Sequence, residues 1–399
     1  MPRFALRRVV LRNYRSVDLC DVRPGRVSYL VGPNGAGKSN FLDALRLVTE
    51  SLTTTLDHAL RDRGGVKQLR RLSTGHPRNF TIDLRMQIDE AEARYLVEVG
   101  AGPRGQYVVQ REHCRVQSTA LGQEPHSFTV RAGVIVETTE QVLPPATADR
   151  LLLVAASGLS VFRPVFDTLG GIGVYNINPD RVRDLQDADS GDLLRRDGSN
   201  LAAVLSRLAR GNPTVKARIE AYLAAVVPGL ESIDAGSVGP KEQVVFRQRV
   251  QGSGGLWSFP AANMSDGTLR AAAVLTALLA PGGGARPSSI VAIEEPESAL
   301  HPAAAGVLRD AIDEASALHQ VLVTSHSPDL LDDPDIDPRA VLAVRSNAGS
   351  TVIGPVDEVG RSAMRDHLYT AGELLRLDQL EPDRSVGPVE DDWTLWSVH

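Results

Sequence analysis

The chain has few cysteines, few lysines and no long apolar run. Cys20 and Cys114 are its only cysteines, and they lie far apart without the spacing of metal ligands. This excludes a disulfide scaffold or a zinc site and favours a reducing compartment. The longest apolar stretch, residues 271–280, is too short to cross a bilayer. Arginines interrupt residues 1–13, which therefore do not resemble a signal peptide, and we expect a cytoplasmic protein without a membrane partner.

Lysine is scarce and arginine abundant: the chain has four lysines, 39 arginines and a net charge of −6. The acidic balance argues against a protein that binds DNA non-specifically over its whole surface. Basic side chains nevertheless gather in two segments, which are either solvated faces or local anion-binding patches. The first holds Arg3, Arg7, Arg8, Arg12 and Arg15, and the second holds Arg61, Arg63, Lys67, Arg70 and Arg71.

The pattern of apolar residues predicts an α/β protein. From Asn79 to Glu137, alternating apolar residues predict an antiparallel meander whose last strand covers Phe128 to Val136. A more helical lobe follows. Towards the C-terminus strands and helices alternate, with buried strands at Ile290–Ile293 and Val321–Thr324, which is typical of a mainly parallel sheet covered by helices. We therefore expect parts at 1–144, 145–235 and 236–377, and an acidic tail at 378–399.

The segment from Gly32 to Ser39 matches the phosphate-binding pattern G-x-x-x-x-G-K-[ST] in full. A short apolar strand precedes it and a helical pattern follows it, as such a loop requires. Backbone N–H groups of the loop would point at phosphate oxygens, Lys38 would neutralise the β- and γ-phosphates, and the Ser39 hydroxyl would bind Mg²⁺. The nucleotide-contacting residues that we expect here are Asn34, Gly35, Ala36, Gly37, Lys38, Ser39 and Asn40.

An apolar strand, Ile290–Ile293, runs directly into the acidic cluster Glu294-Glu295-Pro296-Glu297. The carboxyl end of a strand in an open α/β sheet delivers its side chains to the ligand crevice. By position we assign Glu294 to the metal ion and Glu295 to the attacking water.

A third segment, Met264-Ser265-Asp266-Gly267-Thr268, precedes an alanine- and leucine-rich helix. Ser265 or Asp266 is a suitable N-cap, so the segment is either a plain helix start or an anion site for a γ-phosphate held by a second subunit.

In this order the segments resemble the motif set of the ABC-ATPase superfamily. Met264–Thr268 resembles the signature motif LSGGQ, Ile293–His301 resembles Walker B running into the D-loop, and Val323-Thr324-Ser325-His326 resembles the switch-histidine strand. The phosphate loop, Glu-Glu-Pro-Glu, Thr-Ser-His-Ser-Pro and the opening Asn13-Tyr14-Arg15-Ser16 are similar to the SMC/RecF/OLD-like branch rather than to transporter subunits.

The resemblance implies a P-loop NTPase head that binds ATP and Mg²⁺ and hydrolyses ATP. Two heads would sandwich two ATP molecules, with Ser265 and Gly267 of one facing the γ-phosphate on the other. His326 would contact that γ-phosphate, and Arg15 is a candidate nucleotide contact. The catalytic residues implied are Lys38, Glu295 and His326, with Ser39 and Glu294 at the metal. The sequence departs from the family's motifs at three points. Glu294 stands where Walker B usually has an aspartate, His301 replaces the D-loop aspartate, and Gln87 is only a candidate Q-loop residue.

The resemblance also implies a role in DNA repair or anti-phage defence, with DNA as a candidate partner. Relatives of the OLD type carry a C-terminal Toprim nuclease, for which the residues after His326 are too few. A nuclease or other effector would then be a separate protein. Two alternatives remain open: a transporter-energising subunit, and a regulatory module in which ATP only sets the conformation.

Overall fold

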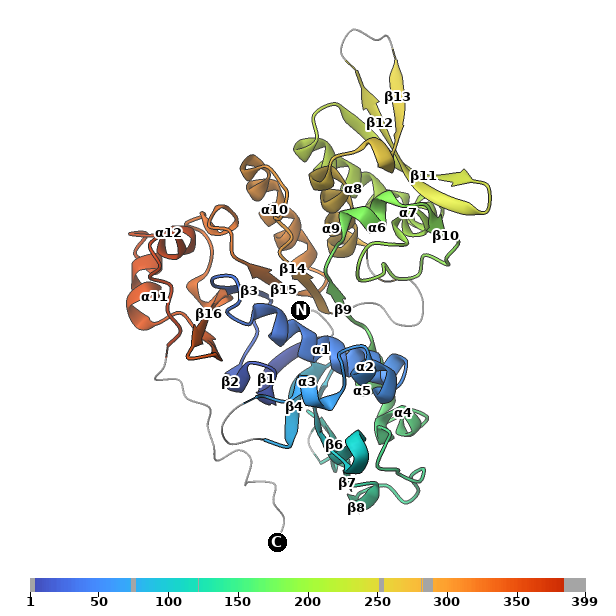
Figure 1. The fold of residues 1–399 in the computed structure, drawn as a ribbon, viewed down its shortest axis with the longest axis vertical. Coiled ribbons are helices and arrows are strands. Elements are labelled where there is room, and N and C mark those ends of the chain that lie inside the picture. Colours follow the sequence, from blue (N-terminus) through green and yellow to red (C-terminus); the bar gives the residue numbers. More distant parts are fainter. Residues whose placement is uncertain are drawn as a thin grey trace. The chain divides into compact units, whose positions relative to one another are not determined.

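The computed structural model describes residues 4–72, 77–120, 122–250, 255–280, 282 and 290–383 (Figure 1). These residues form two compact units. Unit 1 holds residues 26–29 and 171–333, and unit 2 holds residues 4–25, 30–170 and 334–383. The boundaries expected at residues 144, 235 and 377 stay predictions. Arg3 of the first basic segment and residues 384–399 of the expected tail lie outside the described residues.

Unit 2 is built on a large sheet with the strand order β8–β7–β6–β5–β4–β1–β2–β17–β16. Neighbours from β8 to β2 pair antiparallel, whereas β17 pairs parallel to β2. The strands are β1 (Phe4–Tyr14), β2 (Val17–Val22), β4 (Asn79–Ile88), β5 (Ala91–Ala101), β6 (Tyr107–Ser118), β7 (His126–Arg131), β8 (Val134–Thr138), β16 (Val341–Asn347) and β17 (Ser350–Pro355). β3 (Val27–Val31) contributes its first residues to unit 1 and its last two to unit 2.

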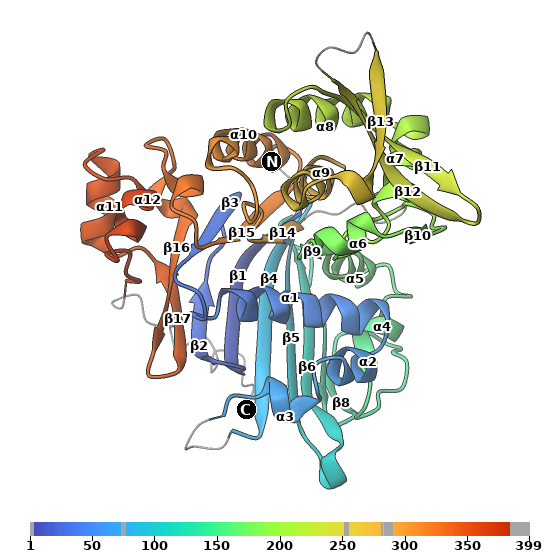
Figure 2. The ribbon, with the colours of Figure 1, turned by 45° about the horizontal axis from the view of Figure 1, so that its top comes forward.

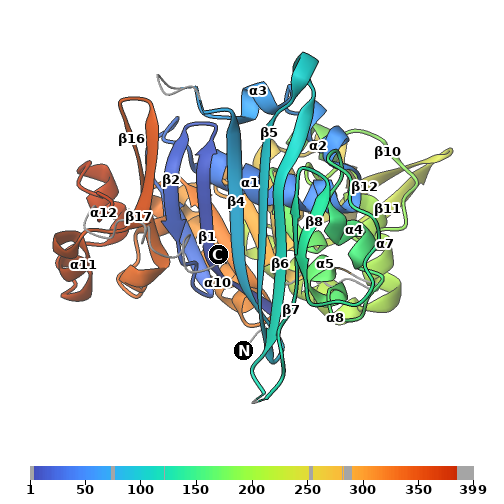
Figure 3. The ribbon, with the colours of Figure 1, turned by 90° about the horizontal axis from the view of Figure 1, so that it is seen from below.

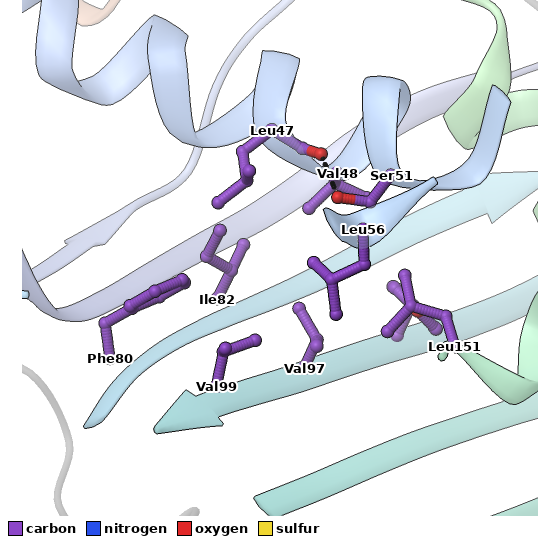
Figure 4. A pocket seen from close by; sticks show the side chains of 10 residues that line it. Leu47, Val48, Ser51, Leu56, Phe80, Ile82, Val97, Val99 and Leu151 are labelled. Carbon is purple, nitrogen blue, oxygen red and sulfur yellow. Dashed lines mark hydrogen bonds between the residues drawn. The ribbon is translucent and has the colours of Figure 1, made fainter. Parts of the chain in front are cut away.

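The core of unit 2 lies between the sheet and helix α1 (Lys38–Thr53), which crosses β4 and β5 in Figure 2. Ile82 of β4 and Val97 of β5 face Leu47 of the helix, as Figure 4 shows. These positions alternate with polar ones along each strand, so one face of the sheet is apolar. The other helices of unit 2 are α2 (Leu56–Arg61), α3 (Val66–Leu69), α4 (Leu152–Ala156), α5 (Arg163–Gly170), α11 (Glu358–Arg365) and α12 (Ala371–Arg376).

One predicted strand is two strands. The segment expected to run unbroken from Phe128 to Val136 turns back at Ala132 and Gly133, whose φ angles are 45° and 84°. Two successive residues with positive φ make the tight reversal of a hairpin, so β7 and β8 pair with each other. The glycine was visible in the sequence, but the apolar alternation continues across it.

Unit 1 contains the parallel strands β9 (Ile172–Tyr175), β14 (Ile290–Glu294) and β15 (Gln320–Ser325), with β14 between the other two. Four residues of β14 and all of β15 are buried. A separate sheet joins β10 (Gln186–Asp187), β12 (Lys241–Arg249) and β11 (Leu230–Val238), with β13 (Leu256–Pro260) on β12. The helices are α6 (Pro179–Arg183), α7 (Leu201–Gly211), α8 (Pro213–Val226), α9 (Asp266–Leu279) and α10 (Ala305–Ser316).

The predicted fold class is confirmed: the chain is an α/β protein with a phosphate-loop helix, parallel strands that precede the acidic cluster, an antiparallel β subdomain and an inserted helical region. Within the described residues, no helix is both long enough and apolar enough to span a bilayer.

Candidate functional site

The phosphate loop of unit 2 connects β3 to α1, and its glycines are required for two different reasons. Gly35 has φ 77° with open space around it, so only its backbone conformation demands glycine. At Gly37, φ is 105° and an added Cβ would lie 2.1 Å from Thr351 Oγ1. At Gly32, a Cβ would lie 2.0 Å from the carbonyl oxygen of Val344. The loop is therefore held closely against β16 and β17.

The start of α1 is suited to an anion. Its N-cap residue Gly37 offers no side-chain cap, and its first turn carries no acidic side chain. The N–H groups of the first turn and the helix dipole therefore favour a phosphate there. The buried Lys38 ammonium donates to the carbonyl oxygens of Gly32 (2.7 Å) and Pro33 (3.0 Å), so it already lies across the loop. Ser39 is exposed at the same helix end, where its hydroxyl can reach a ligand.

Four hydrogen bonds fix the outer side of the loop to residues remote in the sequence. Thr351 Oγ1 on β17 lies 2.9 Å from the Ala36 carbonyl oxygen and 2.6 Å from Ser16 Oγ. Ser16 Oγ accepts a bond of 2.6 Å from Asn40 Nδ2, and its carbonyl oxygen accepts the Thr351 N–H at 2.8 Å. The Asn40 side chain takes part in this network, and its expected contact with the nucleotide stays a prediction. Thr351 was not recognised from the sequence, because no strand was expected there.

Arg15 takes part in a second cluster behind the loop. Its guanidinium lies 2.8 Å from the Asp43 carboxylate, which also contacts Arg46 and Arg63 and accepts from the Tyr14 hydroxyl. Burial of Asp43 opposes its ionisation, but Arg63, the Tyr14 hydroxyl and the other arginines outweigh it, and the pKa of Asp43 is lowered. Arg15 thus helps to anchor α1, and its contact with a nucleotide stays a prediction.

Unit 1 places the predicted acid residues at the end of β14. Glu295 has φ 46°, an uncommon conformation for a non-glycine residue, and its N–H donates to the Thr324 carbonyl oxygen at 3.0 Å. Its Oε1 lies 3.2 Å from Nδ1 of His326, without the alignment of a hydrogen bond. The structure therefore brings Glu295 and His326 together. Glu294, expected at the metal, lies 3.2 Å from the Arg196 guanidinium.

Arg270, one turn into α9, holds the main chain at this strand end. The guanidinium of this half-buried side chain donates to the carbonyl oxygens of Ile177 (2.8 Å), Glu294 (3.2 Å) and Glu295 (3.0 Å). Burial lowers its pKa, against the pull of the three nearby glutamates. These bonds favour the positive φ of Glu295, because they fix both carbonyl groups beside it. Arg270 lies two positions after the recognised segment Met264–Thr268, and sequence reasoning assigned it no role.

Glu297 is a half-buried carboxyl group at the site, and the sequence assigned it no role. Its Oε1 accepts a bond of 2.6 Å from Ser325 Oγ, while its buried Oε2 has no hydrogen-bond partner. Burial raises the pKa of Glu297, partly offset by the Ser325 hydroxyl. A carboxyl group of this kind keeps its proton to a higher pH than an exposed one.

The signature-like segment is both a helix start and a tightly packed turn. Ser265 caps α9 by accepting the Thr268 N–H at 3.2 Å, and Asp266 pairs with Arg183. At Gly267 a Cβ would lie 2.4 Å from the carbonyl oxygen of Ala299, so glycine is needed for packing. The N-cap interpretation of Ser265 is therefore confirmed, while phosphate binding by Ser265 and Gly267 stays a prediction.

The remaining candidates serve local structure. His301 caps the short turn Pro302–Ala304 by accepting the Ala303 N–H at 3.2 Å. Gln87 donates to the carbonyl oxygens of Asp89 and Ala91 and so holds the β4–β5 turn. Over the described residues, no group of three or more His, Cys, Asp or Glu side chains is arranged to hold a metal ion. The Ser39 hydroxyl and Glu294 carboxylate are oxygen donors of the kind that Mg²⁺ takes together with phosphates.

Comparison with known proteins agrees with this geometry. The model of the family described as "AAA domain, putative AbiEii toxin, Type IV TA system" matches residues 27–109 and 176–332, more than half of the chain. No curated protein matches the chain.

Two of the solved structures that match this chain illustrate the shared fold. One is an Smc head bound to the C-winged helix domain of ScpA, with 13% identity, 87% of this chain and 96% of that chain covered, and a TM-score of 0.55. The other is the Pyrococcus furiosus Smc head with an extended coiled coil, bound to the C-terminal domain of ScpA, with 12% identity, 92% and 99% coverage and a TM-score of 0.57. The chain therefore belongs to this AAA-domain family and has the fold of an ABC/SMC-type ATPase head.

Proposed function

We propose that the chain hydrolyses ATP to ADP and phosphate, with the loop Asn34–Asn40 binding the phosphates and Glu295 activating the water. The observation that carries this proposal is the Glu295–His326 pair at the ends of β14 and β15. Glu295 accepts a proton from the attacking water. The oxygen of that water bonds to the γ-phosphorus while the bond between the γ-phosphorus and the β-phosphate oxygen breaks. Lys38 releases its loop carbonyl oxygens and balances the charge that develops on the phosphates.

Magnesium would be held by the Ser39 hydroxyl and the Glu294 carboxylate and would neutralise charge on the β- and γ-phosphates. For that role Glu294 has to leave Arg196, whose side chain is 41% exposed and therefore able to move. His326 donates to a γ-phosphate oxygen, and its neighbour Glu295 favours the orientation that this requires.

ATP binding also brings two copies of the chain together in this proposal. Ser265 of one copy donates its hydroxyl to the γ-phosphate bound by the other, assisted by the start of α9 and the close turn at Gly267. Dimerisation switches an activity in DNA repair or anti-phage defence, with DNA and a separate effector protein as partners. The Smc heads of the same fold are bound to domains of ScpA, which supports a protein partner for this head as well.

The proposal is tested by phosphate release from Mg-ATP by the purified chain and by the Lys38→Ala and Glu295→Gln variants. Lys38→Ala removes nucleotide binding and turnover together. Glu295→Gln retains binding and loses turnover. A nucleotide-sensing module would instead bind ATP in the wild type and in Glu295→Gln with the same low turnover in both. DNA cleavage by the chain alone would contradict the separate effector.

A further inference from the structure

The carboxyl ends of β14 and β15, which lie side by side in Figure 2, are joined at two points beyond the strands. At the first, the Glu295 N–H donates to the carbonyl oxygen of Thr324 at 3.0 Å. At the second, Ser325 Oγ donates to Oε1 of Glu297 at 2.6 Å. Glu295 and His326 belong to the same two chain segments. The two connections therefore restrain how these side chains face each other.

The Ser325 hydroxyl connects Glu297 to the main chain on both sides of His326. Besides donating to Glu297, it accepts the Ser327 N–H at 3.0 Å. A serine that bonds the N–H group two positions further on stabilises a local turn. Ser325 is fully buried, so water cannot replace Glu297 as its acceptor. The carbonyl oxygen of Ser327 lies 3.5 Å away, which is too long for a good hydrogen bond.

No hydrogen bond at Nδ1 fixes the ring of His326. This atom lies 3.2 Å from Glu295 Oε1 without the alignment of a hydrogen bond, and within the described residues it has no hydrogen-bond partner. The His326 side chain is also 38% exposed. The direction of the ring therefore depends on the main chain around it, which is the part that Ser325 and Glu297 hold.

Stability by itself does not favour the polar pair of Glu297 and Ser325. Oε2 of Glu297 is buried and has no hydrogen-bond partner in the part of the chain that the structure describes. A buried polar atom without a partner destabilises a fold, whereas an apolar pair of similar shape in place of two bonded polar groups is often neutral or stabilising. The presence of the pair therefore points to a role in the site.

We propose that Glu297 is a positioning residue, which acts through Ser325 to hold the main chain at His326 so that the ring faces the Glu295 carboxylate. The inference rests on the proposed function, in which His326 contacts the γ-phosphate and Glu295 activates the water. Glu297 itself does not touch the reacting atoms. The direction of the ring is a property of the protein without nucleotide, so it can be measured separately from turnover.

The test uses the full chain with Glu297→Gln, Glu297→Met, Ser325→Ala and the double variant Glu297→Met/Ser325→Ala. Glutamine keeps an oxygen that can accept the Ser325 hydroxyl, and methionine does not. The matched control is Glu242→Met, because Glu242 is also half-buried with a buried Oε2 that lacks a partner among the described residues. It lies on β12, beside β11 in Figure 3, in the other sheet of unit 1. Thermal melting shows that each protein is folded.

The first readout is the NMR signals of the His326 ring in protein with 15N-labelled histidine and no nucleotide, assigned by their loss in His326→Gln. Glu297→Met and Ser325→Ala are expected to shift these signals in the same direction. The double variant shifts them no further, because both substitutions break one connection. Glu297→Gln and Glu242→Met leave them in place. Unshifted signals in Glu297→Met and Ser325→Ala overturn the inference, as does an equal shift in Glu242→Met.

The second readout is steady-state ATP turnover. Glu297→Met should lower kcat by about 10-fold to 100-fold with KM within about twofold, because a displacement of about 1 Å at a site has effects of this size. Glu297→Gln should restore most of kcat, and the double variant should be no slower than the slower single variant. A normal kcat in Glu297→Met, or losses that multiply in the double variant, overturn the inference. Absence of turnover in the wild type, with the expected ring signals, contradicts the proposed function alone.

Discussion

The guanidinium of Arg270 donates a hydrogen bond of 3.0 Å to the main-chain carbonyl oxygen of Glu295. Arg270 lies one turn into helix α9, and Glu295 carries the carboxylate that we assign to the attacking water. The contact is to the backbone of Glu295, so Arg270 positions this residue without touching the reacting atoms.

Substitution of Arg270 therefore affects turnover more than nucleotide binding. We expect Arg270→Met to lower kcat by about 100-fold while KM changes little, because a displacement of the catalytic carboxylate of about 1 Å has that effect. Arg270→Lys keeps the charge but cannot reach three carbonyl oxygens, so it restores only part of kcat. Steady-state ATPase kinetics of both variants measure kcat and KM. A KM that rises while kcat is unchanged would contradict a positioning role.

Thr351 is expected to set the affinity of the phosphate loop. Its hydroxyl lies 2.9 Å from the Ala36 carbonyl oxygen and 2.6 Å from Ser16 Oγ. Thr351→Val keeps the shape and removes the hydroxyl, which should weaken binding of a fluorescent ATP analogue by about twofold to tenfold, the value of one hydrogen bond. Thr351→Ser restores the hydroxyl and should recover most of the affinity. If the Thr351→Val variant binds the ATP analogue as tightly as the wild type, the affinity of the loop does not depend on this network.

The sequence reveals some of the site residues and not others. The phosphate loop, the strand before Glu294 and the histidine after β15 were predicted, because each is a local pattern of strand followed by polar residues. Thr351 was missed because it contacts Ala36 across 315 positions of sequence, from a strand that had not been expected. Arg270 was missed because its partners are main-chain carbonyl oxygens, which no residue type reveals.

Glu112 makes the stability of unit 2 depend on pH. Its buried carboxyl group accepts hydrogen bonds from the N–H groups of Leu152 and Leu153 and from the Tyr95 hydroxyl, and burial raises its pKa from 4.5 to about 7. A raised pKa favours the protonated form in the folded state. The stabilisation is therefore complete below the unfolded pKa and is lost as pH rises through the folded pKa.

The comparison of wild type with Glu112→Gln isolates this effect, because glutamine resembles the protonated side chain. Between about pH 5 and about pH 8 the free energy of unfolding of the wild type should fall by about 1–3 kcal/mol relative to the variant. Urea unfolding at several pH values measures the difference. Parallel pH profiles would show that Glu112 titrates outside this range.

The most direct test of the central claim is light scattering of Glu295→Gln with and without Mg-ATP, alongside ATP turnover of the wild type. The exposed Glu124→Gln is a matched control. The account predicts that Glu295→Gln is a monomer that becomes a dimer only with ATP. It also predicts that the wild type and Glu124→Gln hydrolyse ATP while Glu295→Gln turns over at least about 100-fold more slowly. A mass unchanged by ATP, together with equal turnover in all three proteins, would contradict it.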